Sequence, residues 1–539
     1  MKEKELQGMD EVLVHDVGDS VELENSGKSK KIKRIIILLI LLLVIAFIIV
    51  AIILLFTGND KEKEKSDSKT SIEILMKDSQ FIKPKSSLKK YELIQIKDSK
   101  YKIFLFHDPK TLGGGIELKT NFGSDTDIID GFSHYAEHIF FEGTENITEY
   151  DLEILSNQYL EFSNAYTDIE EVVFQFFASN YTFETLLDYI SQFIQKPILN
   201  ETKFITEINA VDSEYNLYNF TDETAYEILI DNSNPEHGFS QTITGHCGNN
   251  YTLHNYTADV LRDYLKNFYL TIFKPENCVL LLYSSKSLEE MRNYAEKYYN
   301  FKLDEPTEEF NKLFNKKLQT LDKPIFKKEQ LGKFVAFNQS RETPIISFFF
   351  QISQKNKHIN ALEILSYLFN GKKEGSLFKY LYDKNYITNI EFIPFYNFKK
   401  YQIISFDFHL TREGNDNIDK IMEALFASIN IFKEDSNIEV LIQNIKTMEE
   451  KKFKFREEVP TVIPDDINFF VNNYTIFGTD NLLGNPNKNI YDKKRVLEIL
   501  EELSPDNCFI TLDTPYKVDI SNLNDTKMLI TRSHKVEYN

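Results

Sequence analysis

Apolar and polar residues alternate in three short runs between residues 91 and 124, and this spacing is typical of strands with one face in a core. The runs lie in YELIQIKDSKYKIFLFHDPKTLGGGIELKTNFGS, where Asp-Ser and a glycine-rich turn separate them. A helix is expected next, in GFSHYAEHIFFEG, and strand character returns in SNAYTDIEEVVFQFFAS. Long amphipathic segments then run from Phe183 to Glu227. Strands and helices mixed in this way predict an α+β fold.

The second half of the chain repeats this order. Residues 345–371 (IISFFFQIS…ALEILSYLFNG) resemble residues 115–143 at an offset of 228. Two Pro-acid-Asn-Cys segments, which end at Cys278 and Cys508, lie 230 residues apart. The agreement favours duplication over a chance similarity of two α+β domains. We therefore predict two copies of one module, each a mainly antiparallel sheet packed with helices.

The bulk composition limits the class of protein. At 539 residues, of which 42% are hydrophobic, the chain can hold two or three domains with proper cores. A net charge of −21 argues against a nucleic-acid partner and against a surface that binds anionic lipid broadly. Three cysteines, at 247, 278 and 508, are too few and too scattered for a disulfide framework. The last two open apolar runs and are expected to be buried in strands.

An unbroken apolar run of 22 residues, 35–56, is long enough to cross a bilayer as a helix. It is too long, and begins too far into the chain, for a cleaved signal peptide, and it lacks the polar interruptions of a buried core helix. Five basic residues lie just before it, in 28–34, which predicts a cytosolic N-terminus and a single-pass membrane protein whose remaining residues are extracellular or luminal. Residues 1–34 are then a disordered cytosolic tail, and residues 57–79 are a charged stalk.

The segment GFSHYAEHIFFEGTE carries the first candidate chemistry. On a helix, His134 and His138 would lie one turn apart on one face, with Glu137 beside the second imidazole. Two imidazoles on one face are a ready pair of metal ligands, although a surface helix can also carry two histidines and an acid. A third ligand is needed to decide between these interpretations.

A second helical segment, ETKFITEINAVDSEYNLYNF, offers that ligand. Glu207 and Glu214 are seven residues apart, which is two helical turns on one face. This spacing would let Glu214 bind a metal while Glu207 holds a ligand imidazole by a hydrogen bond. Taken alone, the pattern also fits a solvated helix face.

Together these two segments resemble the insulinase/pitrilysin metallopeptidase family, the inverted zincins. EINAVDSE ends 76 residues after His138, and SNAYT, HGFS…GNNYTL and EGSLFKYLYDKNYITNI also have counterparts in the N-terminal half of the four-module members. The resemblance covers about residues 80–539 in order. It implies a catalytic module at 80–310 and an inactive module at 311–539, in which Leu362, Leu365 and Ser366 replace the motif residues.

The resemblance assigns roles to the candidate residues. His134, His138 and Glu214 become the ligands of one zinc ion per chain, Glu137 the catalytic general base, and Glu207 the acid that holds a ligand imidazole. The chemistry agrees, because zinc lowers the pKa of its bound water and polarises the scissile carbonyl, and Glu137 can take the water's proton.

Substrate contacts follow from the same resemblance. Asn164 and Ala165 lie on the family's edge strand, which receives substrate backbone as an added strand, and Phe141 lines the pocket beside the metal. The implied function is a membrane-anchored zinc metalloendopeptidase that hydrolyses unfolded peptides. The alternative is a catalytically silent peptide-binding or scaffold subunit of a peptidase complex. Since four-module members close a chamber with their C-terminal half, a second two-module chain is expected, either another copy or a partner that resembles the C-terminal half.

Overall fold

The computed structural model describes most of the chain from Ser71 onward. The described residues are 71–197, 206–211, 213–214, 224–240, 256–338, 343–353, 360–397, 400–434, 437–456, 470, 473–474, 478–479, 481–485, 491–516, 529–530 and 537–538. The predicted tail, the apolar run 35–56 and most of the stalk lie outside them. Within the described residues, no helix is long and apolar enough to cross a bilayer.

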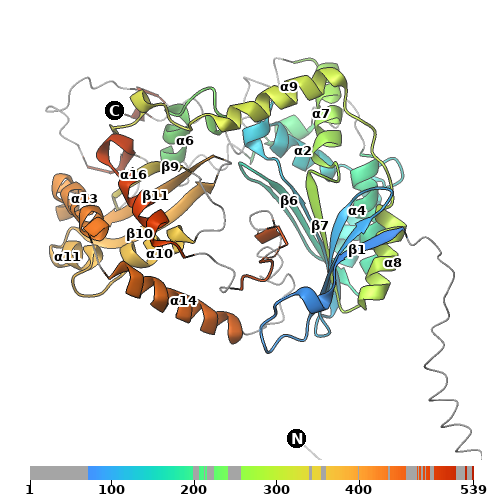
Figure 1. Cartoon of the computed structure of the whole chain (residues 1–539). Coiled ribbons are helices and arrows are strands. Elements are labelled where there is room, and N and C mark those ends of the chain that lie inside the picture. Colours follow the sequence, from blue (N-terminus) through green and yellow to red (C-terminus); the bar gives the residue numbers. More distant parts are fainter. Residues whose placement is uncertain are drawn as a thin grey trace, which may run out of the picture. The chain divides into compact units, whose positions relative to one another are not determined.

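Seven strands form the first sheet, in the order β1-β2-β3-β7-β4-β6-β5. Their bounds are β1 (Ile72–Met76), β2 (Lys90–Ile96), β3 (Lys102–His107), β4 (Gly113–Thr120), β5 (Leu160–Thr167), β6 (Val172–Ser179) and β7 (Cys278–Ser284). Three of them, β1, β6 and β7, are labelled in Figure 1. Every neighbouring pair is antiparallel except β3 and β7. Strand β1 corrects the predicted stalk of residues 57–79: its apolar IEILM sequence pairs with β2, so residues 72–76 belong to the first sheet.

The second sheet has the order β10-β11-β9-β12-β8-β14-β13. Its strands are β8 (Lys333–Phe337), β9 (Ile345–Ser353), β10 (Ile387–Asn397), β11 (Tyr401–Leu410), β12 (Cys508–Asp513), β13 (Leu529–Ile530) and β14 (Glu537–Tyr538). Five strands have the same arrangement in both sheets: the spatial order β3-β7-β4-β6-β5 in the first corresponds to β8-β12-β9-β11-β10 in the second. In each set only the first two strands, β3 with β7 and β8 with β12, are parallel. Cys278 and Cys508 open the equivalent strands β7 and β12 and are buried, as predicted. The α+β class is confirmed.

Helices cover one face of each sheet. Around the first sheet they are α2 (Phe132–Phe140), α3 (Glu149–Ile154), α4 (Phe183–Gln195), α7 (Ala258–Ile272), α8 (Leu288–Tyr299) and α9 (Glu308–Leu318). In the second half they are α10 (Ala361–Phe369), α11 (Leu377–Asp383), α12 (Arg412–Asn415), α13 (Ile418–Glu434), α14 (Ile438–Lys454) and α16 (Lys493–Glu502). Ile116 and Leu118 of β4 share one buried cluster with apolar residues of α2, α4, α7 and α8, which gives the first module its main core.

The glycine-rich stretch that forms the start of β4 was expected to be a turn, and this prediction is wrong. Gly113 and Gly114 are already paired with β6. A Cβ atom on Gly113 would lie 2.2 Å from the carbonyl oxygen of Ala178, and one on Gly114 would lie 2.4 Å from the Phe183 ring. The glycines are therefore needed because the neighbouring strand and helix approach the backbone closely.

The opposite faces of the two sheets are covered by segments from the other half of the chain. Phe470, Leu482 and Leu483 belong to a buried cluster with residues of β2, β3 and β7 in the first sheet. In return, helix α6 (Thr224–Asp231) contributes Ile228 to a cluster with residues of β8, β9 and β12 in the second. Each half therefore completes the core of the other.

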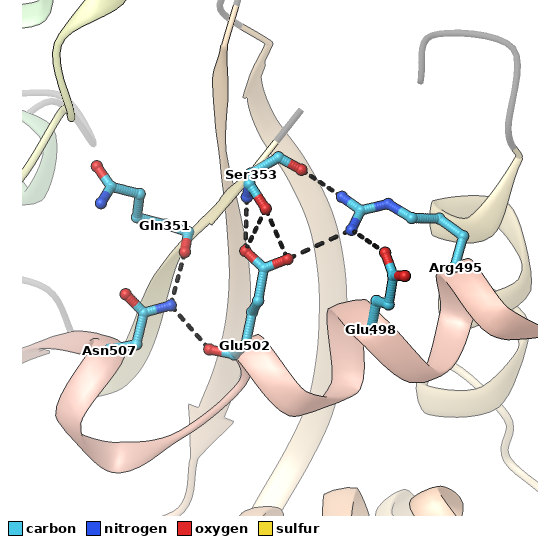
Figure 2. Close-up of polar contacts among 6 residues, drawn as sticks. All are labelled: Gln351, Ser353, Arg495, Glu498, Glu502 and Asn507. Carbon is cyan, nitrogen blue, oxygen red and sulfur yellow. Dashed lines mark hydrogen bonds and ion pairs between the residues drawn. The ribbon is translucent and has the colours of Figure 1, made fainter. Parts of the chain in front are cut away.

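A polar network fixes the end of β9 to α16 (Figure 2). The Ser353 amide donates to Glu502 at 2.6 Å, and Arg495 donates to the Ser353 carbonyl and, at 3.3 Å, to the Glu502 carboxylate. The Asn507 amide donates to the backbone carbonyls of Gln351 and Glu502, at 2.6 Å and 2.7 Å. This network satisfies backbone groups at the edge of the second core.

Candidate functional site

Helix α2 is capped at its N-terminus, and its apolar side packs in the first core. Gly131 precedes it with φ of 83°, a conformation that favours glycine. The Ser133 amide, in the first helical turn, donates to Asp127 at 2.9 Å, so Asp127 caps the helix. Tyr135 and Ile139 are buried in the first core. His134, Glu137 and His138 therefore sit on a helix whose position is well determined.

The structure brings His134, His138 and Glu214 together. The two Nε2 atoms are 3.3 Å apart, and Glu214 Oε2 lies 3.5 Å from His134 Nε2 and 3.1 Å from His138 Nε2. Glu207 lies on the other side of His138, with its carboxylate 3.1 Å from Nδ1. Both acids lie in the helical residues 206–211 and 213–214, as their spacing predicted.

This arrangement fits a zinc ion. Four ligands placed tetrahedrally about 2.0–2.1 Å from zinc stand roughly 3.3 Å from one another, close to the separations of these three atoms. The donor set of two imidazoles and a carboxylate is one that zinc prefers. Glu207 engages Nδ1 of His138 and so leaves Nε2 facing the other ligands. Within the described residues, this is the one cluster of His, Cys, Asp and Glu whose ligand atoms converge, all within 4.8 Å.

The charges of the cluster support the same interpretation. Burial lowers the pKa of His138, but hydrogen bonds to Glu207 and Glu214 outweigh burial and raise the pKa to about 9. Hydrogen bonds from His134 and then His138 hold the pKa of Glu214 below its ordinary value. Without a metal ion the two carboxylates thus favour a protonated His138 imidazole, and a bound cation would take the place of that proton.

Glu137 lies next to the cluster and is tied to the edge strand. Burial raises the pKa of its carboxyl above the ordinary value, although the nearby His134 opposes this shift. The Thr167 hydroxyl, at the end of β5, donates a hydrogen bond to Glu137 Oε2 at 2.6 Å. The carboxylate is therefore held in place beside the three ligand atoms.

The predicted substrate residues lie on β5 and at the end of α2. Asn164 and Ala165 are paired with Gln175 and Phe174 of β6. Among the described residues β5 has no strand on its other edge, so that edge is open to an added strand. The ring of Phe141 packs 5.9 Å from the ring of Phe176, and its role beside the metal stays a prediction.

Sequence reasoning missed two residues of the site, Asp127 and Thr167. Thr167 is the last residue of the SNAYT segment, so the segment was identified but the contact with Glu137 was not. Asp127 lies six residues before Ser133, outside the spacing of an ordinary helix cap, and the bend at Gly131 brings it back to the helix.

Two family models match the chain. One, described as Insulinase (Peptidase family M16), matches residues 102–233, and the other, described as Peptidase M16 inactive domain, matches residues 259–440. The first match contains all of the proposed metal ligands. The second match begins at residue 259, before the predicted module boundary at 310. It therefore includes β7 (residues 278–284), which pairs with strands of the first sheet.

Several curated proteins are similar over much of this chain. The insulin-degrading enzyme homolog of Dictyostelium discoideum is 25% identical over 349 residues, covering 63% of this chain and 34% of that protein. The insulin-degrading enzyme of Homo sapiens is 26% identical over 373 residues, covering 66% and 35%. The A-factor-processing enzyme of Saccharomyces cerevisiae is 22% identical over 390 residues, covering 70% and 36%. The chain thus spans about a third of the length of these relatives.

Solved structures share the fold. Pitrilysin superposes with a TM-score of 0.74 at 18% identity, covering 87% of this chain and 48% of that chain. A protease from Helicobacter pylori superposes with a TM-score of 0.60 at 16% identity, covering 79% of this chain and all of that chain. The two-module architecture therefore corresponds to about half of one neighbour and to the whole of another.

Proposed function

This chain belongs to the insulinase/pitrilysin family of peptidases, and on that basis we propose that it is a zinc metalloendopeptidase that hydrolyses unfolded peptides. The observation that carries the proposal is the convergence of His134, His138 and Glu214 beside Glu137. A zinc ion bound there would polarise the scissile carbonyl and lower the pKa of a water molecule.

The chain's own residues supply the remaining steps. Glu207 fixes the orientation of the His138 ring through Nδ1. Glu137 takes the proton of the attacking water and returns it to the leaving amine. The free edge of β5, at Asn164 and Ala165, binds the substrate backbone as an added strand. Because this requires an extended backbone, unfolded peptides are substrates and folded proteins of ordinary stability are spared.

Glu137→Gln tests the function directly. The full chain with this substitution is expected to keep about one zinc per chain and to lose turnover of an unfolded peptide by a factor of ~100 or more. Glu363→Gln, which changes a half-buried glutamate on α10, is the matched control and is expected to cleave normally. Full activity of Glu137→Gln would contradict the proposed role.

A second candidate is a catalytically silent peptide-binding or scaffold subunit. It is favoured by the match of residues 259–440 to a family model described as Peptidase M16 inactive domain. For the peptidase, we propose that a second two-module chain covers the site, either another copy or a partner resembling the C-terminal half, since an open site positions a peptide poorly. A monodisperse monomer with full peptidase activity would contradict this assembly.

Zinc-loaded protein that binds but never cleaves peptides, with or without a partner from the native membrane, would favour the silent subunit.

We further propose that residues 35–56 anchor the chain in a membrane, with the N-terminus cytosolic and the catalytic part extracellular or luminal. The support is the run of 22 apolar residues and the basic residues before it. Leu43→Arg with Phe47→Arg should release the protein from membranes in alkaline carbonate, because a central arginine costs about 2.5–3.5 kcal/mol. Ser66→Arg, in the stalk, should leave it bound. Equal extraction of both variants and the wild type would contradict the anchor.

A further inference from the structure

Thr167 joins the edge strand to the carboxylate beside the metal site. Its hydroxyl donates to Glu137 Oε2 at 2.6 Å. Within the described residues, no other group is recorded as donating a hydrogen bond to that carboxylate. Glu137 has three rotatable side-chain bonds, and this hydrogen bond restricts the orientation of its carboxylate.

The strand geometry explains why Thr167 reaches Glu137. Alternate side chains of a strand point to the same face, so Ala165 and Thr167 share one face of β5. Ala165 packs against the first core, to which α2 belongs, and Thr167 meets α2 at Glu137. Tyr166, between them, points to the other face, where its hydroxyl contacts Glu171 at 3.4 Å.

We propose that Thr167 is a positioning residue that aims the Glu137 carboxylate, so that one strand both receives the substrate and orients the catalytic base. The inference rests on the proposed peptidase function. The hydrogen bond occupies Oε2 and leaves Oε1 to accept the proton of the attacking water. A misplacement of about 1 Å in a reacting group can cost about 100-fold in rate, so loss of this single contact matters.

Three variants of the full chain separate positioning from packing. Thr167→Val keeps the shape and β-branching of the side chain but removes the donor, and Thr167→Ser keeps the donor but removes a methyl group. Thr148→Val is the matched control, because Thr148 makes a similar 2.7 Å hydrogen bond to Asp151 on an exposed turn. The first readout is structural and needs neither metal nor activity: the position of the Glu137 carboxylate in a high-resolution structure of each variant.

In Thr167→Val the carboxylate is expected to leave its position or to occupy several, whereas in Thr167→Ser it stays. In kinetics, Thr167→Val should lower kcat by about 10–100-fold with KM changed less than about 2-fold, and Thr167→Ser should restore most of kcat. Zinc content should be the same in all variants. In the Glu137→Gln background, Thr167→Val should add no further loss, because its effect acts through Glu137.

The structural and kinetic readouts fail separately. An unmoved Glu137 carboxylate in Thr167→Val overturns the positioning role, whatever the activity. A displaced carboxylate with unchanged kcat overturns it as well, because orientation then has no consequence. If the Glu137 carboxylate moves in Thr167→Val but the wild-type chain cleaves no peptide, Thr167 does position Glu137. The proposed peptidase function is then wrong.

Discussion

Glu207 acts on the metal site through one hydrogen bond, and its contribution can be measured at the level of a single atom. Glu207→Gln keeps the size of the side chain but weakens the contact to His138 Nδ1, which is 3.1 Å long. Loss of such a partner typically lowers metal affinity 10–100-fold, so we expect zinc affinity to fall by about that factor in a chelator competition assay. His138→Ala should abolish stoichiometric binding, and Glu413→Gln, at an exposed position of α12, should leave it unchanged. Wild-type affinity in Glu207→Gln would show that the contact is structural only.

A second residue-scale prediction concerns Glu117, which is buried on β4 and accepts a hydrogen bond from Gln175 at 2.9 Å. Burial raises the pKa of Glu117 to about 7, although Gln175 and Lys119 oppose the shift. The folded protein therefore holds this proton more tightly than the unfolded chain. Its stabilising contribution is fully present below about pH 4.5 and is lost as the pH rises through about 7.

Glu117→Gln removes this titration and measures it. Between pH 4.5 and 8, the free energy of unfolding of the wild type should fall relative to that of Glu117→Gln by about 2–4 kcal/mol, followed by urea unfolding. Glu73→Gln, on an exposed position of β1, is the control and should run parallel to the wild type. A wild-type curve parallel to Glu117→Gln would mean that the Glu117 carboxyl does not change its proton affinity on folding.

The residues of the candidate metal site could be singled out from sequence, because their spacing within each helical segment is local and the two segments together resemble one family. A four-residue step on α2 and a seven-residue step on the second helix fix which side chains share a face. Thr167 and Asp127 could not be predicted, because their contacts depend on where a strand end and a bend at Gly131 lie in space. The glycines at the start of β4 were wrongly predicted to form a turn for the same reason, since they allow close contact with Ala178 and Phe183.

At the scale of elements, the polar contact between the end of β9 and α16 contributes to the stability of the second module. The Arg495 side chain is 6% exposed and donates to both the Ser353 carbonyl and Glu502 (Figure 2). Arg495→Met would leave this carbonyl and part of the carboxylate buried without their cationic donor. We expect a loss of about 1–3 kcal/mol in stability, seen as a lower midpoint of thermal unfolding. Arg412→Met, at an exposed position of α12, should have no such effect, and equal midpoints for both variants would contradict the account.

The element order itself was accessible from sequence, because duplication could be read from two independent markers. The five-strand path that recurs in both sheets follows the predicted repeat, with Cys278 and Cys508 opening equivalent strands. It could not be predicted from sequence that each half of the chain supplies a segment that covers the sheet of the other half. Nothing in the local sequence around Phe470, Leu482 and Leu483 shows that these side chains pack on the first sheet, whose strands β2, β3 and β7 lie far earlier in the chain.

At the scale of the whole molecule, that exchange predicts that the two halves fold as one unit. Phe470 is 1% exposed, and its ring lies 4.7 Å from that of Phe104 and 5.9 Å from that of Tyr91, both in the first sheet. Replacing a buried phenylalanine by alanine typically costs 3–5 kcal/mol. Phe470→Ala should therefore destabilise the first module although the residue belongs to the second half of the chain.

Amide hydrogen exchange distinguishes this coupling from a local effect. In Phe470→Ala, protection should fall in β2 and β3, whose residues form the other side of the cluster, and zinc should bind more weakly as the sheet behind the site loosens. Phe455→Ala, 71% exposed in the same half, is the matched control and should leave both sheets protected. Protection lost only in the second sheet would show that the halves unfold separately. Loss in β2 and β3 would mean that the first module cannot be studied without the second, because Phe470, Leu482 and Leu483 form part of its core.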